Sequence, residues 1–306
     1  MMQPYHFLVP LDGSRLAESV LPTVERLAGA CSARVTLLHI VEQHPPTSVH
    51  GEHHLATGAE ARGYLEEVAT RLRSTGLAVE THVHEDGEDD VAKGIVEHAR
   101  EPGISMVIMC THGHGGLRDW LFGSIAQQAL QRGTPSILLV FPREDGSAPA
   151  FEPRRVLVPL DGTAEHEPAL PVALDLARIF GACLHLIFVV PTVATLSDEQ
   201  AASGLLLPAT MKAVLNLAQQ GAQEYLEQIA RQSQQSGVTA TAEVLRGDAV
   251  SALLAEAERL NIDLVVMASH GHAGLSAQLK KSVAPRMTGR VHRPLLLVRA
   301  VCEAGH

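Results

Sequence analysis

Short runs of consecutive apolar residues alternate with longer amphipathic stretches along the first half of the chain. The runs are rich in Val, Ile and Leu, and they predict strands at 7–11, 34–41, 78–84, 106–110 and 136–141. Continuous apolar runs, without polar residues at every second position, are typical of parallel strands covered on both faces. Between these runs the apolar residues recur at helical spacing, which predicts helices at 15–30, 59–75, 88–101 and 124–132. Gly76 and Gly133 are placed to end two of these helices.

This alternation of strands and helices indicates the class of fold. Strand, helix and strand in succession favour right-handed crossovers, and therefore a parallel, doubly wound sheet. In such sheets ligands bind beyond the carboxyl ends of the strands. We therefore predict an α/β fold and expect the functional residues in the loops that follow the strands.

The second half of the chain repeats the first. The segment V-P-L-D-G occurs at 9–13 and again at 158–162, and M-C-T-H-G-H-G-G-L at 109–117 corresponds to M-A-S-H-G-H-A-G-L at 267–275. The distance between the copies grows by about nine residues along the way, so the second copy carries an insertion, which we place at 192–210. A period of about 150 residues is the size of one ordinary domain. We predict two tandem domains, 1–145 and 153–306, each with a five-stranded, mostly parallel sheet.

Composition narrows the class of protein. Hydrophobic residues make up 46% of the chain, enough for two cores, but no apolar run approaches the roughly 18 residues of a membrane span. The net charge is −10 and basic residues do not cluster, so we expect no nucleic-acid partner and no membrane partner. The first residues lack the features of a secretory signal, and the four cysteines form no C-x-x-C pair. We therefore expect a cytoplasmic protein with reduced thiols.

Two of the loops after strands carry candidate ligand-binding residues. Asp12-Gly13-Ser14 follows the first strand and recurs as Asp161-Gly162-Thr163, although the same residue types also suit a turn and a helix N-cap. The loop at 111–124 is rich in glycine and ends where a helix is predicted. Glycines let the backbone approach a ligand and a helix start favours an anion, so a phosphate site and an ordinary surface turn both remain open. No Lys precedes Ser124, which excludes the G-x-x-x-x-G-K-[ST] loop.

On these residues the chain resembles the universal stress protein family in its tandem form. The resemblance covers essentially the whole chain and is carried by V-P-L-D-G-S, L-L-H-I-V, M-C-T-H-G-H-G-G-L-R-D-W-L-F-G-S-I-A and T-P-S-I-L-L-V. It implies a Rossmann-like fold of the adenine nucleotide alpha hydrolase type, and ATP, with Mg²⁺, as the ligand. ATP-binding members of that family show G-x-x-G, nine residues and then G-[ST]. Gly113 and Gly123-Ser124 match the later part of this pattern, whereas Cys110 replaces its first glycine.

The resemblance also implies a role for individual residues. Asp12 would contact the adenosine moiety, the backbone at Ile40 would read the adenine edge, and the glycine loop would hold ribose and phosphates. The full set expected at this first site is Pro10, Leu11, Asp12, Ile40, Met109, Cys110, Gly113, Gly123, Ser124 and Ile125. A weaker second site is expected at Asp161, Val189, Gly271 and Ser282. There Lys281 stands in place of Gly123, and its side chain either fills the phosphate space or supplies a cation.

Other residues with ligand or catalytic chemistry form no recognisable site in the sequence. His82 and His84 would share one face of a strand, but no third ligand is apparent, and we identify no metal site. No nucleophile, base and orienting group lie together, so we identify no catalytic residues.

We predict a protein that binds an adenine nucleotide and acts in stress response or regulation, its domains packed as an internal pseudo-dimer or within a homodimer of tandem chains. Two alternatives remain open. One is an interaction module without nucleotide, and the other is a slow ATPase or self-phosphorylating protein.

Overall fold

The computed structural model describes residues 5–44, 48–49, 51–85, 90–111, 128, 135–143, 150–196, 208–269 and 283–299. The chain divides into two compact units. The first contains Met1–Phe151, His270–Gly274 and Pro294–Arg299, and the second contains Glu152–Ser269, Leu275–Arg293 and Ala300–His306.

The first unit is built on a mostly parallel sheet whose strands follow the order β5-β2-β1-β6-β7-β12. Its parallel strands are β1 (His6–Pro10), β2 (Arg34–Ile40), β5 (Ala78–His84), β6 (Met106–Cys110) and β7 (Ser136–Val140). The last strand, β12 (Leu295–Arg299), pairs with β7 in the antiparallel direction. All five strands predicted for this half are confirmed, with ends that differ by one residue at most.

The helices of the first unit follow the prediction with one break. The single helix predicted at 15–30 is two helices, α1 (Arg15–Glu18) and α2 (Leu21–Cys31), because Pro22 has no backbone N–H to donate and therefore starts a new helix. Gly76, with φ of +90°, follows the end of α3 (Gly58–Ser74), as predicted. The helix α4 (Val91–Ala99) is shorter than predicted, and a small hairpin of β3 (Ser48–Val49) and β4 (Glu52–His53) was not expected. Gly133 and nearly all of 124–132 lie outside the described residues.

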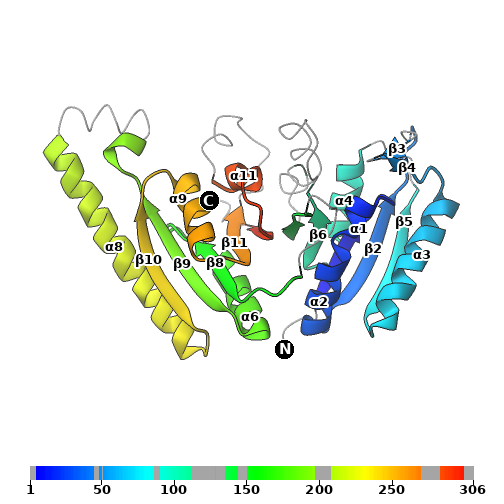
Figure 1. The fold of residues 1–306 in the computed structure, drawn as a ribbon, viewed down its shortest axis with the longest axis horizontal. Coiled ribbons are helices and arrows are strands. Elements are labelled where there is room, and N and C mark those ends of the chain that lie inside the picture. The colour runs from blue at the N-terminus through cyan, green and yellow to red at the C-terminus, as the bar shows by residue number, and fades with distance from the viewer. Residues whose placement is uncertain are drawn as a thin grey trace. The chain divides into compact units, whose positions relative to one another are not determined.

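The second unit repeats this plan around strands in the order β10-β9-β8-β11. Its parallel strands are β8 (Arg155–Pro159), β9 (Cys183–Val190), β10 (Ala240–Arg246) and β11 (Leu264–Ser269). Its helical segments are α6 (Ala169–Phe180), η1 (Val193–Thr195), α8 (Pro208–Gln235), α9 (Ala249–Arg259) and α11 (Val283–Thr288). The helix α8 has 28 residues where α3 has 17, so part of the extra length of the second copy lies in this helix (Figure 1).

The strands form the cores of both units, since their apolar residues are covered on both faces. Leu37, Val107, Ile108 and Leu139 are fully buried in the first unit, and Leu157 and Leu184 are fully buried in the second. Among the helices that the structure describes, none is long and apolar enough to cross a membrane. The sheet therefore provides a rigid base for the loops at its carboxyl edge.

Candidate functional site

The residues expected at the first site gather at one edge of the sheet, as far as the structure describes them. Strand β1 lies between β2 and β6 and runs parallel to both, so the carboxyl ends of all three strands meet there. These ends carry Pro10, Leu11, Asp12, Ile40, Met109 and Cys110. The other expected residues, Gly113, Gly123, Ser124 and Ile125, lie outside the described residues.

Asp12 braces the turn that leaves β1. One carboxylate oxygen, Oδ1, accepts hydrogen bonds from the backbone N–H of Ser14 at 2.9 Å and from its hydroxyl at 2.6 Å. Oγ of Ser14 in turn accepts from the backbone N–H of Ala17 and caps α1. The turn requires Gly13 at its centre, since φ is +88° there. The N-cap interpretation of this motif is therefore confirmed for Ser14, with Asp12 as its support.

The backbone of Ile40 faces the space beyond the end of β1. Strand β1 ends at Pro10, opposite Leu38, and the N–H of Leu11 donates to the carbonyl of Leu38 at 2.8 Å. Strand β2 continues for two more residues, and alternate residues of a strand direct their backbone groups to the same side. On the opposite side, the N–H of Val41 donates to the backbone carbonyl of His84 in β5, at 2.9 Å. The N–H and C=O of Ile40 consequently point toward the side of Asp12, where no residue of β1 pairs with them.

His39, a residue not predicted from the sequence, fixes the start of the same turn. Its imidazole is buried, and Nδ1 lies 2.7 Å from the carbonyl oxygen of Leu11. A carbonyl only accepts, so Nδ1 carries the proton. Burial lowers the pKa of His39, more than the hydrogen bond to Leu11 raises it, and nearby His54 lowers it further. The ring is therefore neutral at neutral pH. A histidine within an apolar strand was the one signal that could have indicated this role.

The segment after β2 packs against the Asp12 turn. The side chain of Leu55 lies 2.9 Å from the position that a Cβ would take on Gly13, which places the two in direct contact. A carboxylate oxygen of Glu52 accepts from the backbone N–H of Arg15 at 2.7 Å. These contacts hold the turn from the outside while His39 holds it from the sheet.

The thiol of Cys110, at the end of β6, has low reactivity. Burial, followed by the negative charge of Asp12, raises the pKa of its thiol to about 12. The thiol is thus protonated at physiological pH and is a poor nucleophile, since only the thiolate reacts well. The influence of Asp12 also shows that the ends of β1 and β6 form a single environment.

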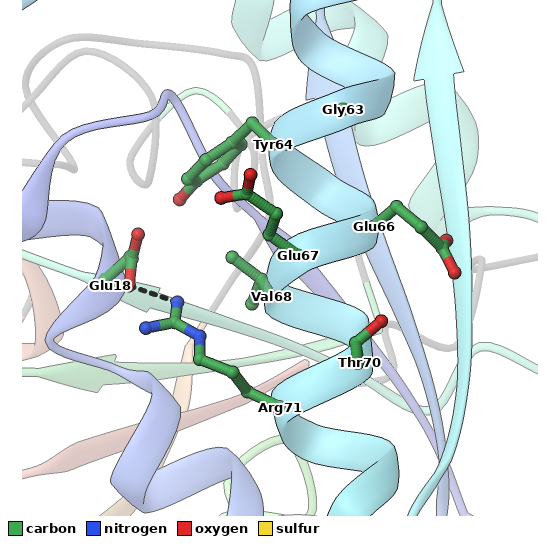
Figure 2. Close-up of a pocket in the computed structure, with 8 residues that line it drawn as sticks. All are labelled: Glu18, Gly63, Tyr64, Glu66, Glu67, Val68, Thr70 and Arg71. Carbon is green, nitrogen blue, oxygen red and sulfur yellow. Dashed lines mark hydrogen bonds and ion pairs between the residues drawn. The ribbon is translucent and has the colours of Figure 1, made fainter.

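A hollow of about 640 Å³ lies where Glu18 of α1 faces α3 (Figure 2). It is lined by Glu18, Gly63, Tyr64, Glu66, Glu67, Val68, Thr70 and Arg71. Arg71 forms an ion pair of 2.5 Å with Glu18, and burial together with the charge of Glu18 raises the pKa of Tyr64. Three carboxylates against one guanidinium disfavour a phosphate. This hollow is therefore a poor candidate for the nucleotide site.

The corresponding turn of the second unit differs in its hydrogen bonds. Oδ1 of Asp161 accepts from the N–H and the hydroxyl of Thr163, at 3.0 and 2.7 Å. Oδ2 lies 2.6 Å from Nδ1 of His166, a residue that stands where the first copy has Ala17. The hydrogen bond that His166 donates to Asp161 raises the pKa of His166. Burial raises the pKa of Asp161, but the hydrogen bonds from His166 and Thr163 lower it, and the pKa falls overall. Both oxygens of this carboxylate are thus engaged within the protein.

The end of β9 is also covered differently from the end of β2. The carbonyl of Ile187 accepts from Leu160, so the backbone of Val189 extends past β8 as that of Ile40 extends past β1. However, Phe188 replaces His39 and belongs to an apolar cluster whose buried residues are Val190, Leu215 and Ala222. Its members, which come from β9, β10, α8 and the segment after β9, are Phe188, Val190, Leu196, Met211, Leu215, Ala222 and Val244. The start of α8 therefore covers this edge of its own unit. Gly271 and Ser282 lie outside the described residues.

Comparison with known proteins identifies the family. The model of the universal stress protein family matches residues 5–140 and again 152–299. A universal stress protein of Mycolicibacterium smegmatis is 26% identical over 311 residues, which cover 96% of this chain and 97% of that protein. One of Methanocaldococcus jannaschii is 28% identical over 146 residues, which cover 48% of this chain and 82% of that protein. The solved structure of an Archaeoglobus fulgidus universal stress protein has the same fold, with a TM-score of 0.68 and 16% identity over 96% of each chain. Because the family model matches twice and spans most of the sequence, the chain belongs to the universal stress protein family, as a tandem of two such domains.

Proposed function

We propose that the first domain binds ATP with Mg²⁺ at the carboxyl edge of β1, β2 and β6, and that the protein acts in stress response or regulation. The observation that carries this proposal is the backbone of Ile40, which points beyond the end of β1 toward Asp12. A backbone N–H and C=O can pair with the edge of a base, and a carboxylate accepts from a ribose hydroxyl. Both groups stand at the sheet edge from which the glycine-rich loop departs.

In this proposal each group at the edge has one task. Pro10 and Leu11 carry the turn, Asp12 accepts from the ribose, and Met109 and Cys110 contact the base. The ribose and phosphates would lie on Gly113, Gly123, Ser124 and Ile125, since glycine amides suit phosphate oxygens. His39 acts as a positioning residue, because it fixes the carbonyl that precedes Asp12.

We propose that the second domain, 153–306, binds nucleotide weakly or not at all. Its Asp161 is held by Thr163 and His166, so a ribose hydroxyl would have to displace one of these hydrogen-bond partners. The apolar cluster that includes Phe188 covers the edge near Val189. Lys281 replaces the glycine expected before Ser282. These features favour one nucleotide per chain, bound within domain 1–145.

Titration calorimetry of the nucleotide-free protein with ATP and Mg²⁺ tests the proposal. We expect one site per chain, abolished by Gly123→Lys, which copies the second domain. Asp12→Asn should weaken binding at least tenfold, because the neutral amide keeps the turn but is a weaker acceptor. The matched control Asp161→Asn should change nothing. Two sites would refute the asymmetry, and no binding would leave the interaction module as the better reading. Phosphate release over many turnovers would establish a slow ATPase instead.

The assembly is part of the same proposal. We propose that the two domains pack as an internal pseudo-dimer, as the duplication of the sequence suggests. Sedimentation analysis should then give the mass of one chain, 32.7 kDa, and twice that mass would indicate a homodimer of tandem chains. A cytoplasmic location stays a prediction.

A further inference from the structure

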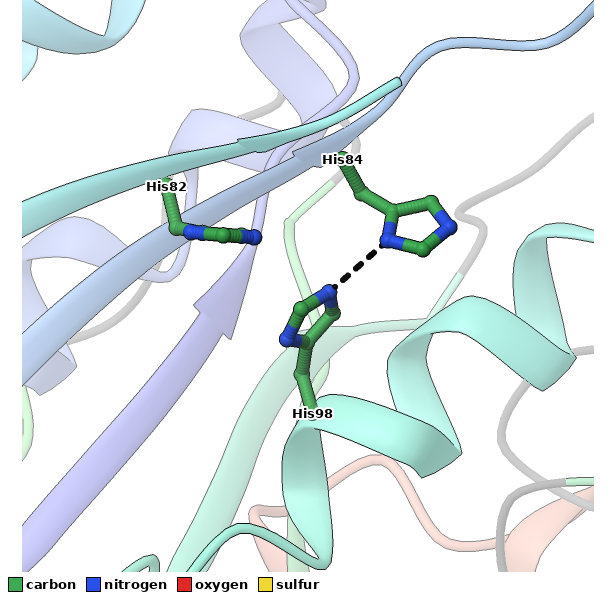
Figure 3. A group of neighbouring side chains, drawn as sticks. All are labelled: His82, His84 and His98. Carbon is green, nitrogen blue, oxygen red and sulfur yellow. Dashed lines mark hydrogen bonds between the residues drawn. The ribbon is translucent and has the colours of Figure 1, made fainter. Parts of the chain in front are cut away.

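Three histidines of the first unit converge on one point of its surface. His82 and His84 alternate on β5, so both side chains lie on the same face of the sheet, and His98 comes from α4 on that face (Figure 3). One ring nitrogen from each lies within 4.8 Å of the other two. His82 is exposed, His98 is half-buried and His84 is buried. The sequence offered only the first two, and the tertiary structure supplies the third.

The packing of α4 explains how His98 reaches this position. Gly94 lies one turn before His98, and a Cβ at Gly94 would come within 2.9 Å of the Ile40 side chain. The helix thus rests directly on β2 at Ile40, which pairs with His84 on the neighbouring strand. Since residues four apart share a face of a helix, His98 is directed toward the histidines of β5.

A hydrogen bond to Glu101 prepares one of the three rings, that of His98, for a cation. Nδ1 of His98 lies 2.5 Å from a carboxylate oxygen of Glu101 and donates to it, so Nε2 carries the lone pair. Nδ1 of His84 lies 3.0 Å from this Nε2 and donates to it. A carboxylate that holds the far nitrogen of a histidine is the usual support of a metal-bound imidazole. The carboxylate of Glu101 is therefore positioned to orient His98 as a metal ligand.

We propose that His82, His84 and His98 form a binding site for a divalent transition-metal ion, with Zn²⁺ as the reference ion. Three imidazoles suit Zn²⁺ and the neighbouring divalent metals, with water as a fourth ligand. Tetrahedral coordination with Zn–N bonds of about 2.0–2.1 Å needs nitrogen atoms about 3.3 Å apart. The two nitrogen atoms of the His84–His98 pair lie 3.0 Å apart, close to that spacing, and His82 would close the site by a rotation of its exposed side chain. When the ion binds, the proton of His84 moves from Nδ1 to Nε2, so the ring stays neutral.

In the part of the second unit that the structure describes, the corresponding positions do not carry this set of ligands. His82 and His84 stand opposite Leu38 and Ile40, and at the corresponding register of β10, Glu243 and Leu245 stand opposite Ile187 and Val189. Arg259 of α9 forms an ion pair of 2.7 Å with Glu243 there. Among the described residues, we therefore expect one such metal site, held by the first domain.

Calorimetric titration of untagged, nucleotide-free protein with Zn²⁺ is the first test, and visible absorption of Co²⁺ reports the coordination geometry. We expect one saturable site and the strong d–d bands of tetrahedral Co²⁺. His82→Gln and His98→Gln should each lower the affinity at least tenfold, and Glu101→Gln should lower it about 10–100-fold. The control Glu243→Gln should leave the affinity unchanged.

Two of these variants keep the test decisive even if a substitution disturbs folding. His82 and Glu101 are exposed, so their replacement leaves the core intact, and thermal unfolding of each variant checks this. The absence of a saturable site would overturn the proposal. So would Zn²⁺ binding of undiminished affinity in both His82→Gln and His98→Gln, which would assign the ion to other histidines of the chain. ATP is absent throughout, so the result is independent of the nucleotide proposal.

Discussion

Replacement of Gly13 by alanine should destabilise the first unit through backbone strain and through a steric contact, whereas the same replacement at Gly162 in the second unit should cause the strain alone. Gly13 has φ of +88° and Gly162, at the same place in the second copy, has φ of +75°, so an alanine is strained at both positions by about 1–2 kcal/mol. The surroundings differ. A Cβ on Gly13 would lie 2.9 Å from two carbons of Leu55, whereas a Cβ on Gly162 would lie 3.7 Å from Phe188, an ordinary contact.

The contact with Leu55 adds a second cost at Gly13 alone. Overpacking costs about 1–3 kcal/mol, and the lower end applies because Leu55 is half-buried and can shift outward. We therefore expect Gly13→Ala to destabilise the first unit by about 2–3 kcal/mol, and Gly162→Ala to destabilise the second by about 1–2 kcal/mol. The difference of about 1 kcal/mol corresponds to roughly a fivefold change in the population of the open state.

Native-state hydrogen exchange measured by mass spectrometry resolves the two units, which a single unfolding curve of a two-domain chain does not. Peptides from β1 and β2 report the first unit, and peptides from β8 and β9 report the second. Each substitution should lower protection in its own unit only. Equal losses for the two variants, or a larger loss for Gly162→Ala, would refute the assignment of the extra cost to Leu55. The double variant Gly13→Ala, Leu55→Ala should recover that extra cost if the contact is its source.

Four further outcomes follow from single side chains. The pKa of His39 in the folded protein is below its ordinary value of 6.5, so the stability that neutral His39 contributes above that pH is lost as the pH falls. His39→Gln should therefore reduce the loss of the first unit's unfolding free energy at acidic pH. The raised pKa of His166 acts oppositely, so the cost of His166→Ala in the second unit should be larger at pH 5.5 than at pH 8.5. Iodoacetamide should alkylate Cys110 far more slowly in the native protein than after denaturation, as peptide mass spectrometry would show, and rapid native labelling would contradict the raised pKa. Thr57→Ala removes the capping box of α3 and should lower the stability of the first unit by about 1 kcal/mol, measured as hydrogen-exchange protection of its peptides, whereas unchanged protection would show that the cap is dispensable.

Much of the first unit could be predicted from local pattern. The apolar runs marked its parallel strands to within one residue, because strands buried on both faces have no polar positions to blur their limits. The helix at 15–30 was predicted as one piece because its apolar spacing continues through Val20. The missing N–H of Pro22 was the signal for the break. The hairpin at β3 and β4 gave no signal, since two-residue strands are too short to show a period.

The candidate site was predictable only where residues are neighbours in sequence. Asp12 and Ser14 stand two residues apart, so their turn could be proposed from residue type alone. The contact of His39 with Leu11 crosses between two strands, and the pairing of Asp161 with His166 depends on the direction of a turn. Neither relation has a periodic signature, so neither could be predicted from the sequence.

The sequence by itself determined the α/β class, the duplication, the family and the strands that carry the candidate nucleotide site, because each of these depends on short-range pattern or on repeated motifs. Only the tertiary structure decided which distant side chains meet. Strand register placed His39 under the Asp12 turn, helix packing through Gly94 brought His98 to His82 and His84, and the longer α8 covered the end of β9. Such meetings follow from the packing of elements that are far apart in the chain. Packing depends on the shape and volume of many side chains at once, which no local window of sequence contains.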